Sequence, residues 1–265
     1  MIYVYNKSVR GFSHIENNTL CQDYSEKYLD KEKQIITCAD GHGSKIYIRS
    51  DRGSRIASNI AIELLKECDY EDLLIYKKNN NFDKLKLEIL CKWHEAVEKD
   101  LENDPLEESN LTEKEKFKIN NNPHIAYGTT LNAVMMFKDL LLCIQIGDGG
   151  MFLIKDREII NALPENDGNV ANLTNSLCGD DAYDNLFINV FNKEDYDGVF
   201  IATDGVLAPY ATYQNLQDNL INVIVNLIKD NAKEIVDEEL DNYFTNLGGE
   251  IGNGDDVSAG IIYYK

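Results

Sequence analysis

The chain has 265 residues, 43% of them hydrophobic, and its 46 acidic against 26 basic residues give a net charge of −20 at pH 7. This length suits one large domain, so we expect residues 1–265 to form a single domain, and the apolar content argues against an intrinsically disordered chain. The acidic balance disfavours nucleic acid and anionic membranes as partners, and no apolar run reaches the roughly 18 residues that span a bilayer.

The segment MIYVYNKSVR at the N-terminus lacks the features of a secretory signal peptide. The six cysteines are scattered without a CxxC pair or a zinc-like spacing. Both observations favour a reduced, cytoplasmic location, and we expect a monomer. The acidic excess reflects solvated helix faces, carboxylates that neutralise bound cations, or both.

The first half of the chain predicts one strand and two helices. Residues 34–40 (QIITCAD) predict a β-strand that ends in an acid. Apolar residues at helical spacing predict amphipathic helices over about 49–68 and 82–103. The polar and charged segment 104–124 predicts an exposed loop or an irregular extension of the second helix.

Strands dominate the middle of the chain. Three stretches of β character follow one another closely, at 129–137, 140–147 and 151–156. The connections between them are short enough for hairpins, so we expect these strands to be antiparallel. Residues 161–185 are rich in Asn, Asp and Gly, which predicts a long surface excursion.

The last third predicts strands, two helices and a final strand. The strands lie at 186–191 and 198–203, the helices at about 216–228 and 232–247, and a Gly/Asp turn then enters the final strand. Helices therefore come in pairs with antiparallel strands between the pairs, unlike the strict alternation of a doubly wound sheet. This order favours an α+β layered sandwich with its sheets packed together and its helices outside.

Four apolar strands end in an aspartate that is followed by Gly or Asp. These aspartates are Asp40, Asp148, Asp204 and Asp255. A single Asp-Gly after a strand is usually only a turn, but four of them could gather at one edge of a sheet. Gathered carboxylates repel one another and need cations, and an all-oxygen ligand set selects Mg²⁺ or Mn²⁺. Two such ions roughly 3.5–4 Å apart can clamp a phosphoryl group for attack by water.

Motifs of several competing chemistries are absent from the sequence. It contains no GxxxxGK[ST], GxSxG, HExxH or Cys-x₅-Arg motif, which disfavours P-loop, α/β-hydrolase, zincin and cysteine-phosphatase chemistry. His42 lies two residues after Asp40 in a glycine-flanked turn. From there it could protonate a leaving alkoxide, which is the task of a general acid. His94 lies within the second predicted helix and is more typical of a structural residue.

Six short motifs follow one another between positions 21 and 258. They are CQDY at 21–24, DGHG at 40–43, YGTT at 127–130, IGDG at 146–149, ATDGV at 202–206 and GDDVS at 254–258. DGHG resembles the signature of the type 2C, metal-dependent serine/threonine protein phosphatases. The other motifs resemble that family's remaining landmarks in the family's order, so the resemblance covers nearly the whole chain. It is closer to divergent bacterial members than to eukaryotic ones.

The resemblance implies a four-layer αββα sandwich, in which two antiparallel sheets are flanked by helix pairs. It also implies a centre of two Mn²⁺ or Mg²⁺ ions, or three, at one end of the sandwich. The implied metal-site residues are Asp40 as the bridge between two ions, the carbonyl of Gly41, Asp204 and Asp255 at the first ion, Asp148 with Asp204 at a third, and Asp23 through a bound water.

The resemblance further implies that metal-activated water attacks phosphoserine or phosphothreonine directly, with Asp40 and His42 as catalytic residues. The expected partner is a phosphorylated protein, which would place the chain in signalling. Two alternatives remain open from the sequence. One is a catalytically weak or inactive phosphatase-like module that regulates or binds a partner, and the other is a metal-dependent hydrolase of small phosphate esters or nucleotides.

Three positions depart from the family's pattern. Gln22 stands where the family usually has Glu, and Asn18 stands where members often have a phosphate-binding Arg. Asp256 replaces the family's Asn, which adds a negative charge near the ions. The residues that could substitute for the missing Arg are Arg10, Arg49, Arg52, Arg55 and His14.

Overall fold

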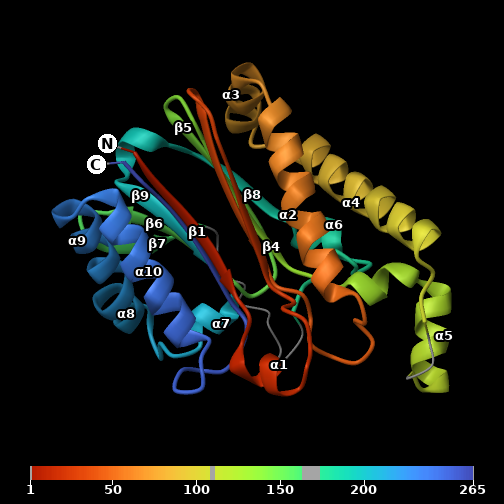
Figure 1. The fold of residues 1–265 in the computed structure, drawn as a ribbon. Helices are drawn as coiled ribbons and strands as arrows, with labels where there is room; N and C mark the ends of the chain where they lie inside the picture. Colours follow the sequence, from red (N-terminus) through yellow and green to blue (C-terminus); the bar gives the residue numbers. More distant parts are fainter. Residues whose placement is uncertain (1, 108–110, 163–173, 265) are drawn as a thin grey trace.

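The computed structural model describes residues 2–107, 111–162 and 174–264 and consists of two antiparallel five-stranded sheets packed face to face (Figure 1). The first sheet has the order β1 (Tyr3–Val9), β10 (Val257–Tyr263), β9 (Gly198–Ala202), β6 (Gly150–Lys155) and β7 (Glu158–Asn161). The second has the order β2 (Tyr24–Leu29), β3 (Lys33–Ala39), β4 (Leu131–Phe137), β5 (Leu140–Ile146) and β8 (Phe187–Asn192).

Helices cover the outer face of each sheet (Figure 1). The second sheet carries α2 (Ser50–Glu67), α3 (Tyr70–Asn79) and α4 (Asp83–Asn103), and the first carries α8 (Tyr213–Leu216), α9 (Asn222–Asp230) and α10 (Lys233–Leu247). The remaining helical segments are α1 (Phe12–Glu16), α5 (Glu113–Asn121), η1 (Pro123–Tyr127), α6 (Ala182–Asn185), η2 (Lys193–Asp195), α7 (Asp204–Leu207) and the π-helical turn η3 (Gln217–Ile221). The predicted α+β sandwich with four αββα layers is confirmed.

The core has three layers because both faces of each sheet are covered. Neighbouring residues of one strand point to opposite faces, so Ile35 of β3 packs under the helices of the second sheet while Ile36 packs between the sheets. All seven residues of β3 are buried for this reason. Within the described residues, no helix is both long and apolar enough to cross a membrane.

The helices predicted at 49–68 and 82–103 are confirmed as α2 and α4. Residues 104–124 differ from the prediction, because α5 is a separate helix. It begins with a capping box between Thr112 and Glu115, and it buries Ile119 in the core. The strands β1, β2 and β7 and the helix α3 were not predicted. The helix predicted at 216–228 is interrupted by η3.

The expected hairpin between the strands at 140–147 and 151–156 is wrong. These strands, β5 and β6, belong to different sheets, and β6 pairs with β7 and β9. Gly147 has a φ of +112° between them, a backbone conformation that favours glycine, and the chain leaves one sheet for the other there. Of the surface excursion predicted at 161–185, residues 163–173 lie outside the described residues, and Leu177 is fully buried.

Candidate metal centre

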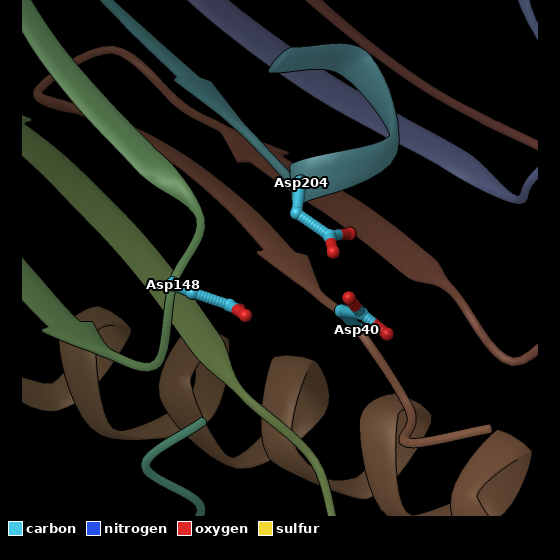
Figure 2. Close-up of side chains that lie close together, drawn as sticks. All are labelled: Asp40, Asp148 and Asp204. Carbon is cyan, nitrogen blue, oxygen red and sulfur yellow. The ribbon is translucent and has the colours of Figure 1, made fainter. Parts of the chain in front are cut away.

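Three carboxylates meet at one end of the sandwich (Figure 2). Asp40 follows β3, Asp148 follows β5 and Asp204 follows β9, so both sheets contribute. One oxygen of each of the three carboxylates lies within 4.8 Å of the others. Asp40 is half-buried, whereas Asp148 and Asp204 are exposed. Three acids that are far apart in sequence are therefore held within reach of one cation.

These carboxylates line a cavity of about 350 Å³ that contains further acids. Its lining consists of His14, Gln22, Asp23, Asp40, Gly41, His42, Gly43, Ser44, Tyr47, Asp148, Thr174, Asp204, Asp255 and Asp256. Six of these residues are aspartates, and none of the described lining residues is Lys or Arg. The cavity is thus strongly negative.

The backbone of Asp40 is fixed by two threonines. Its amide donates to Thr130 Oγ1 at 2.9 Å. Its carbonyl accepts hydrogen bonds from Thr130 N and Thr129 Oγ1, both at 2.9 Å. The YGTT motif therefore anchors the main chain of Asp40, which leaves the carboxylate free to face the cavity.

Gly41 lies where a side chain has no room. A Cβ at this position would be 2.5 Å from the carbonyl oxygen of Ser50 and 2.6 Å from that of Gln22. The Gly41 amide donates to Gln22 O at 3.1 Å. The glycine thus allows the chain after β3 to pass closely between two other backbone segments.

Asp23 is buried against the first sheet. It is 6% exposed, and its Oδ2 accepts a 2.8 Å hydrogen bond from Thr203 Oγ1, one residue before Asp204. Burial raises the pKa of the Asp23 carboxyl well above its usual range, and the charges of Asp256 and Asp204 raise it further. A cation near this group would offset the free-energy cost of burying the ionised carboxylate.

The pKa values of Asp40 and Asp204 are also raised. The main cause for both groups is the loss of hydration of the carboxyl within the cavity, although part of the Asp204 residue remains exposed. The charge of Asp23 adds to it at Asp40, and that of Asp148 adds to it at Asp204. Such a set of oxygen donors with uncompensated charge fits Mg²⁺ or Mn²⁺, which prefer carboxylate, carbonyl and water ligands.

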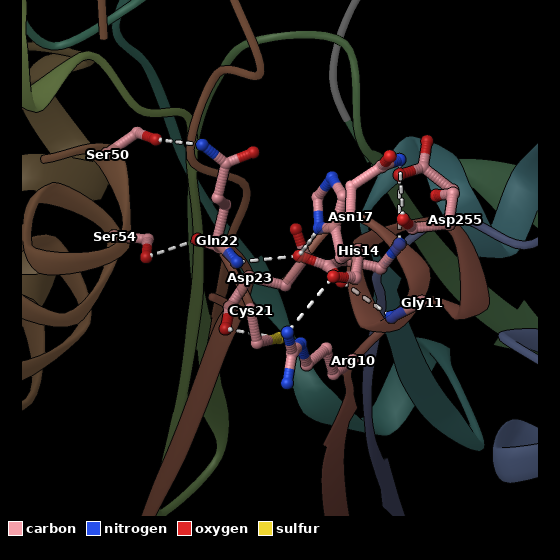
Figure 3. Close-up of polar contacts among 12 residues, drawn as sticks. Arg10, Gly11, His14, Asn17, Cys21, Gln22, Asp23, Ser50, Ser54 and Asp255 are labelled. Atoms are coloured by element: carbon pink, nitrogen blue, oxygen red, sulfur yellow. Dashed lines mark hydrogen bonds and ion pairs between the residues drawn. The ribbon is translucent and has the colours of Figure 1, made fainter. Parts of the chain in front are cut away.

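Asp148 and Gln22 are each held by side-chain hydrogen bonds. Thr174 Oγ1 donates to Asp148 Oδ2 at 2.6 Å. The amide nitrogen of the Gln22 side chain donates to Ser50 Oγ at 2.7 Å (Figure 3). It also donates to the carbonyl of His42 at 3.3 Å. Gln22 therefore acts as a donor in this structure, which a glutamate could not do.

His42 lies on the cavity wall beside Tyr47. The two rings pack edge to face, with centroids 4.8 Å apart. The His42 amide donates to Gly128 O at 3.1 Å. Burial lowers the pKa of the imidazole, while the charge of Asp148 acts in the opposite direction.

Asp256 is nearly inaccessible and is held from three directions. Its two oxygens accept hydrogen bonds of 2.6 Å from the amides of Gly11 and Gln22. Oδ2 also lies 2.9 Å from Nδ1 of His14. The negative charge that Asp256 adds at this position therefore has hydrogen-bonding and charged partners in the N-terminal segment. Asp256 nevertheless still lines the cavity.

All the residues predicted for the site line this one cavity: Asp23, Asp40, Gly41, His42, Asp148, Asp204 and Asp255. The close trio is Asp40, Asp148 and Asp204, rather than the grouping of Asp40 with Asp204 and Asp255. No pattern in the sequence points to Thr174, to the contact of Thr203 with Asp23 or to that of His14 with Asp256, because these contacts join segments that are distant in the chain.

The arginines considered as phosphate ligands make other contacts. Arg10 donates to the carbonyl of His14. Arg49 and Arg52 pair with Asp100 and Asp104, and Arg55 lies over the ring of Tyr24. Of the candidates named from the sequence, His14 alone is among the described lining residues.

Comparisons with known proteins find a matching family and similar solved structures. A family model described as protein phosphatase 2C matches residues 10–244. A sequence search of curated proteins finds no match. Many solved structures are similar in fold.

Three of those structures illustrate the similarity. The serine/threonine phosphatase PstP/Ppp of Mycobacterium tuberculosis is 16% identical, with a TM-score of 0.62 over 100% of this chain and 99% of that one. The catalytic domain of PstP in complex with two manganese ions is 16% identical, with a TM-score of 0.61 and coverage of 99% and 97%. RsbX in complex with magnesium is 14% identical, with a TM-score of 0.54 and coverage of 100% and 96%.

Proposed function

We propose that this chain, which belongs to the protein phosphatase 2C family, hydrolyses phosphoserine and phosphothreonine in proteins and requires bound Mn²⁺ or Mg²⁺ to do so. The family supports a serine/threonine phosphatase function. The observation that carries the proposal for this chain is the close meeting of Asp40, Asp148 and Asp204 from three strand ends. Carboxylates this close repel one another, and a bound cation would offset that repulsion.

The proposed ligands are those that line the cavity. Asp40, the Gly41 carbonyl, Asp204 and Asp255 would hold two of the ions. Asp148 would join Asp204 at a third position, and Asp23 would hold a bound water. When present, the ions would supply Lewis-acid polarisation of water and charge neutralisation of the phosphoryl group.

The protein's own groups have separate tasks in this proposal. Thr129 and Thr130 hold the backbone of Asp40, and Thr203 orients the Asp23 carboxylate. The His42 imidazole would donate a proton to the leaving alkoxide of serine or threonine. Its placement against Tyr47 restricts its rotation.

Hydrolysis of p-nitrophenyl phosphate and of a phosphothreonine peptide tests the proposal. We expect turnover with millimolar Mn²⁺ and none with EDTA. Asp204→Asn should lower kcat by more than about 100-fold, because even changes outside the ligand shell of a metal cost about 10–100-fold. Asp230→Asn, at the exposed end of α9, is the matched control and should retain full turnover. Absence of Mn²⁺-dependent turnover in the unaltered protein would refute the proposal.

A second candidate function is a phosphatase-like binding module without catalysis. It is favoured by the engagement of the Gln22 amide with Ser50 and by the absence of Lys and Arg from the described cavity lining. Calorimetric titration with Mn²⁺ beside the activity assay separates the two functions. A catalyst binds at least two ions and turns over, whereas a binding module takes up one ion or none and shows no turnover.

A further inference from the structure

We propose that His14, oriented by Asp256, binds the phosphoryl group of the substrate in this cavity. The inference rests on the proposed function, since it takes a phosphate ester as the ligand. In this inference a histidine of α1 binds a phosphate dianion inside an acidic cavity.

The charge of the cavity creates the need for such a group. Six aspartates line it, and the described lining contains no Lys or Arg. Bound cations would be largely neutralised by these carboxylates, so a dianionic phosphate also needs a donor from the protein. His14 and His42 are the two described lining residues whose side chains can carry a positive charge.

The contact with Asp256 determines how His14 presents its ring. Nδ1 of His14 lies 2.9 Å from Oδ2 of Asp256. An imidazolium carries a proton on each ring nitrogen, so with Nδ1 facing Asp256 it offers Nε2 as a donor. The other ring nitrogen, Nε2, lies on the far side of the imidazole from this contact (Figure 3). From that side Nε2 can donate a charge-assisted hydrogen bond to a phosphate oxygen.

Asp256 is a rigid support for this ring. Its side chain is 3% exposed, and the amides of Gly11 and Gln22 hold its two oxygens. The imidazole of His14 is 20% exposed, so it remains accessible from the cavity. A buried carboxylate behind an accessible histidine fixes the direction in which the histidine can donate.

The backbone of α1 is fixed as well. Arg10 Nη2 and the Thr19 amide both donate to the His14 carbonyl, at 3.0 and 2.8 Å. Ser13 donates to Gly254 O from its amide and from its hydroxyl, which attaches α1 to the turn that carries Asp255. His14 is thus tied to the same turn as one of the proposed metal ligands.

The test measures phosphate binding and catalysis side by side in the Mn²⁺-loaded protein. The probes are inorganic phosphate, titrated by calorimetry in a phosphate-free buffer, and p-nitrophenyl phosphate for KM and kcat. We expect His14→Ala to raise the phosphate Kd about 10- to 100-fold, the usual effect of losing a hydrogen bond to a charged group. KM should rise by a similar factor, while kcat changes less than about threefold.

Two further variants make the result specific. His14→Arg should bind phosphate within about threefold of the unaltered protein, because the guanidinium keeps the charge and the donors. Ile15→Ala, which alters an exposed neighbour on the same helix, should leave Kd, KM and kcat unchanged. Mn²⁺ affinity and thermal unfolding are measured for each variant, to show that the metal centre and the fold persist.

Failure of this inference is distinct from failure of the proposed function. If the protein binds phosphate but hydrolyses no ester, the proposed function fails, and the Kd values of His14→Ala and His14→Arg still decide the role of His14. The inference is overturned if His14→Ala binds phosphate as tightly as the unaltered protein, if His14→Arg binds it as weakly as His14→Ala, or if the unaltered protein binds no phosphate.

Discussion

The hydroxyl of Thr203 donates a 2.8 Å hydrogen bond to the buried carboxylate of Asp23 and thereby joins the two sheets at the candidate metal centre. Thr203 follows β9 in the first sheet, and Asp23 precedes β2 in the second. The same hydroxyl accepts a hydrogen bond from the Ser258 amide at 2.9 Å. One side chain therefore partners a buried carboxylate and a buried amide together.

Replacing Thr203 by Val should destabilise the protein by about 1–3 kcal/mol, because both partners of the hydroxyl would be left buried without it. The pKa of Asp23 should rise further, since the hydrogen bond from Thr203 lowers it. Urea unfolding measures the loss. Thr245→Val, at an exposed position of α10, is the control and should change the unfolding free energy by less than about 0.5 kcal/mol. Equal effects of the two substitutions would contradict the role given to Thr203.

The metal-free protein should lose stability as the pH rises. The folded pKa values of Asp23 and Asp40 lie above the unfolded values, so the folded state holds more protons than the unfolded state once the pH exceeds about 4. Their contribution is therefore complete below the unfolded pKa and declines as the pH rises through the folded pKa. Thermal unfolding in EDTA between pH 5 and 8 should show a falling Tm.

Saturating Mn²⁺ should remove most of that decline, because the bound cation compensates the ionised carboxylates. Metal-free Asp204→Asn should show a shallower decline than the unaltered protein, since one repelling charge is gone. If the Tm of the metal-free protein instead rose steadily over this pH range, the carboxylates would not destabilise the folded state by repelling one another.

Asp148→Asn and Asp255→Asn should affect different ions. Asp148 belongs to the close trio with Asp40 and Asp204, whereas Asp255 lines the cavity outside it. Each substitution should lower the number of Mn²⁺ ions bound by one in a calorimetric titration and leave the remaining affinity within about tenfold. If Asp255→Asn abolished all binding while Asp148→Asn changed nothing, the trio would not be a site of its own.

Gln22→Glu should destabilise the metal-free protein more than Gln22→Met. Both variants lose the hydrogen bond to the His42 carbonyl, and Glu also places a charge against that carbonyl oxygen inside an acidic cavity. The Ser50 hydroxyl, which accepts from Gln22, can turn to donate to Glu but not to Met. We expect a loss of about 1–3 kcal/mol for Glu. Saturating Mn²⁺ should recover more stability for Glu than for Met, because the carboxylate then has a cation nearby. The reverse order in EDTA would show that Gln22 is not needed as a donor.

Gly205→Ala should disturb the start of α7. A Cβ on Gly205 would overlap the carbonyl oxygen of Asp256, a backbone atom that cannot move alone. We expect a loss of about 1–3 kcal/mol in the unfolding free energy, typical of an overpacked site. Gly43→Ala is the matched control, since its Cβ would meet its nearest neighbour at an ordinary 3.6 Å. Similar unfolding curves for the two variants would refute the close approach of α7 to Asp256.

Local patterns in the sequence determined much of this molecule. Helices α2 and α4 could be predicted from the spacing of their apolar residues. The strands before Asp40, Asp148 and Asp204 could be predicted from their β-forming residues and from the glycine that follows each aspartate. The candidate acids were found the same way, because a strand that ends in Asp-Gly is visible within a few residues. These features depend on near neighbours in the chain.

Only the tertiary structure decided how those pieces meet. It placed β5 and β6 in different sheets, and it brought Asp148 rather than Asp255 into the close trio. It also joined Thr203 to Asp23 and His14 to Asp256, pairs separated by 180 and 242 positions. Such contacts arise from sheet packing and from the burial of charged groups, and no periodicity along the chain encodes them.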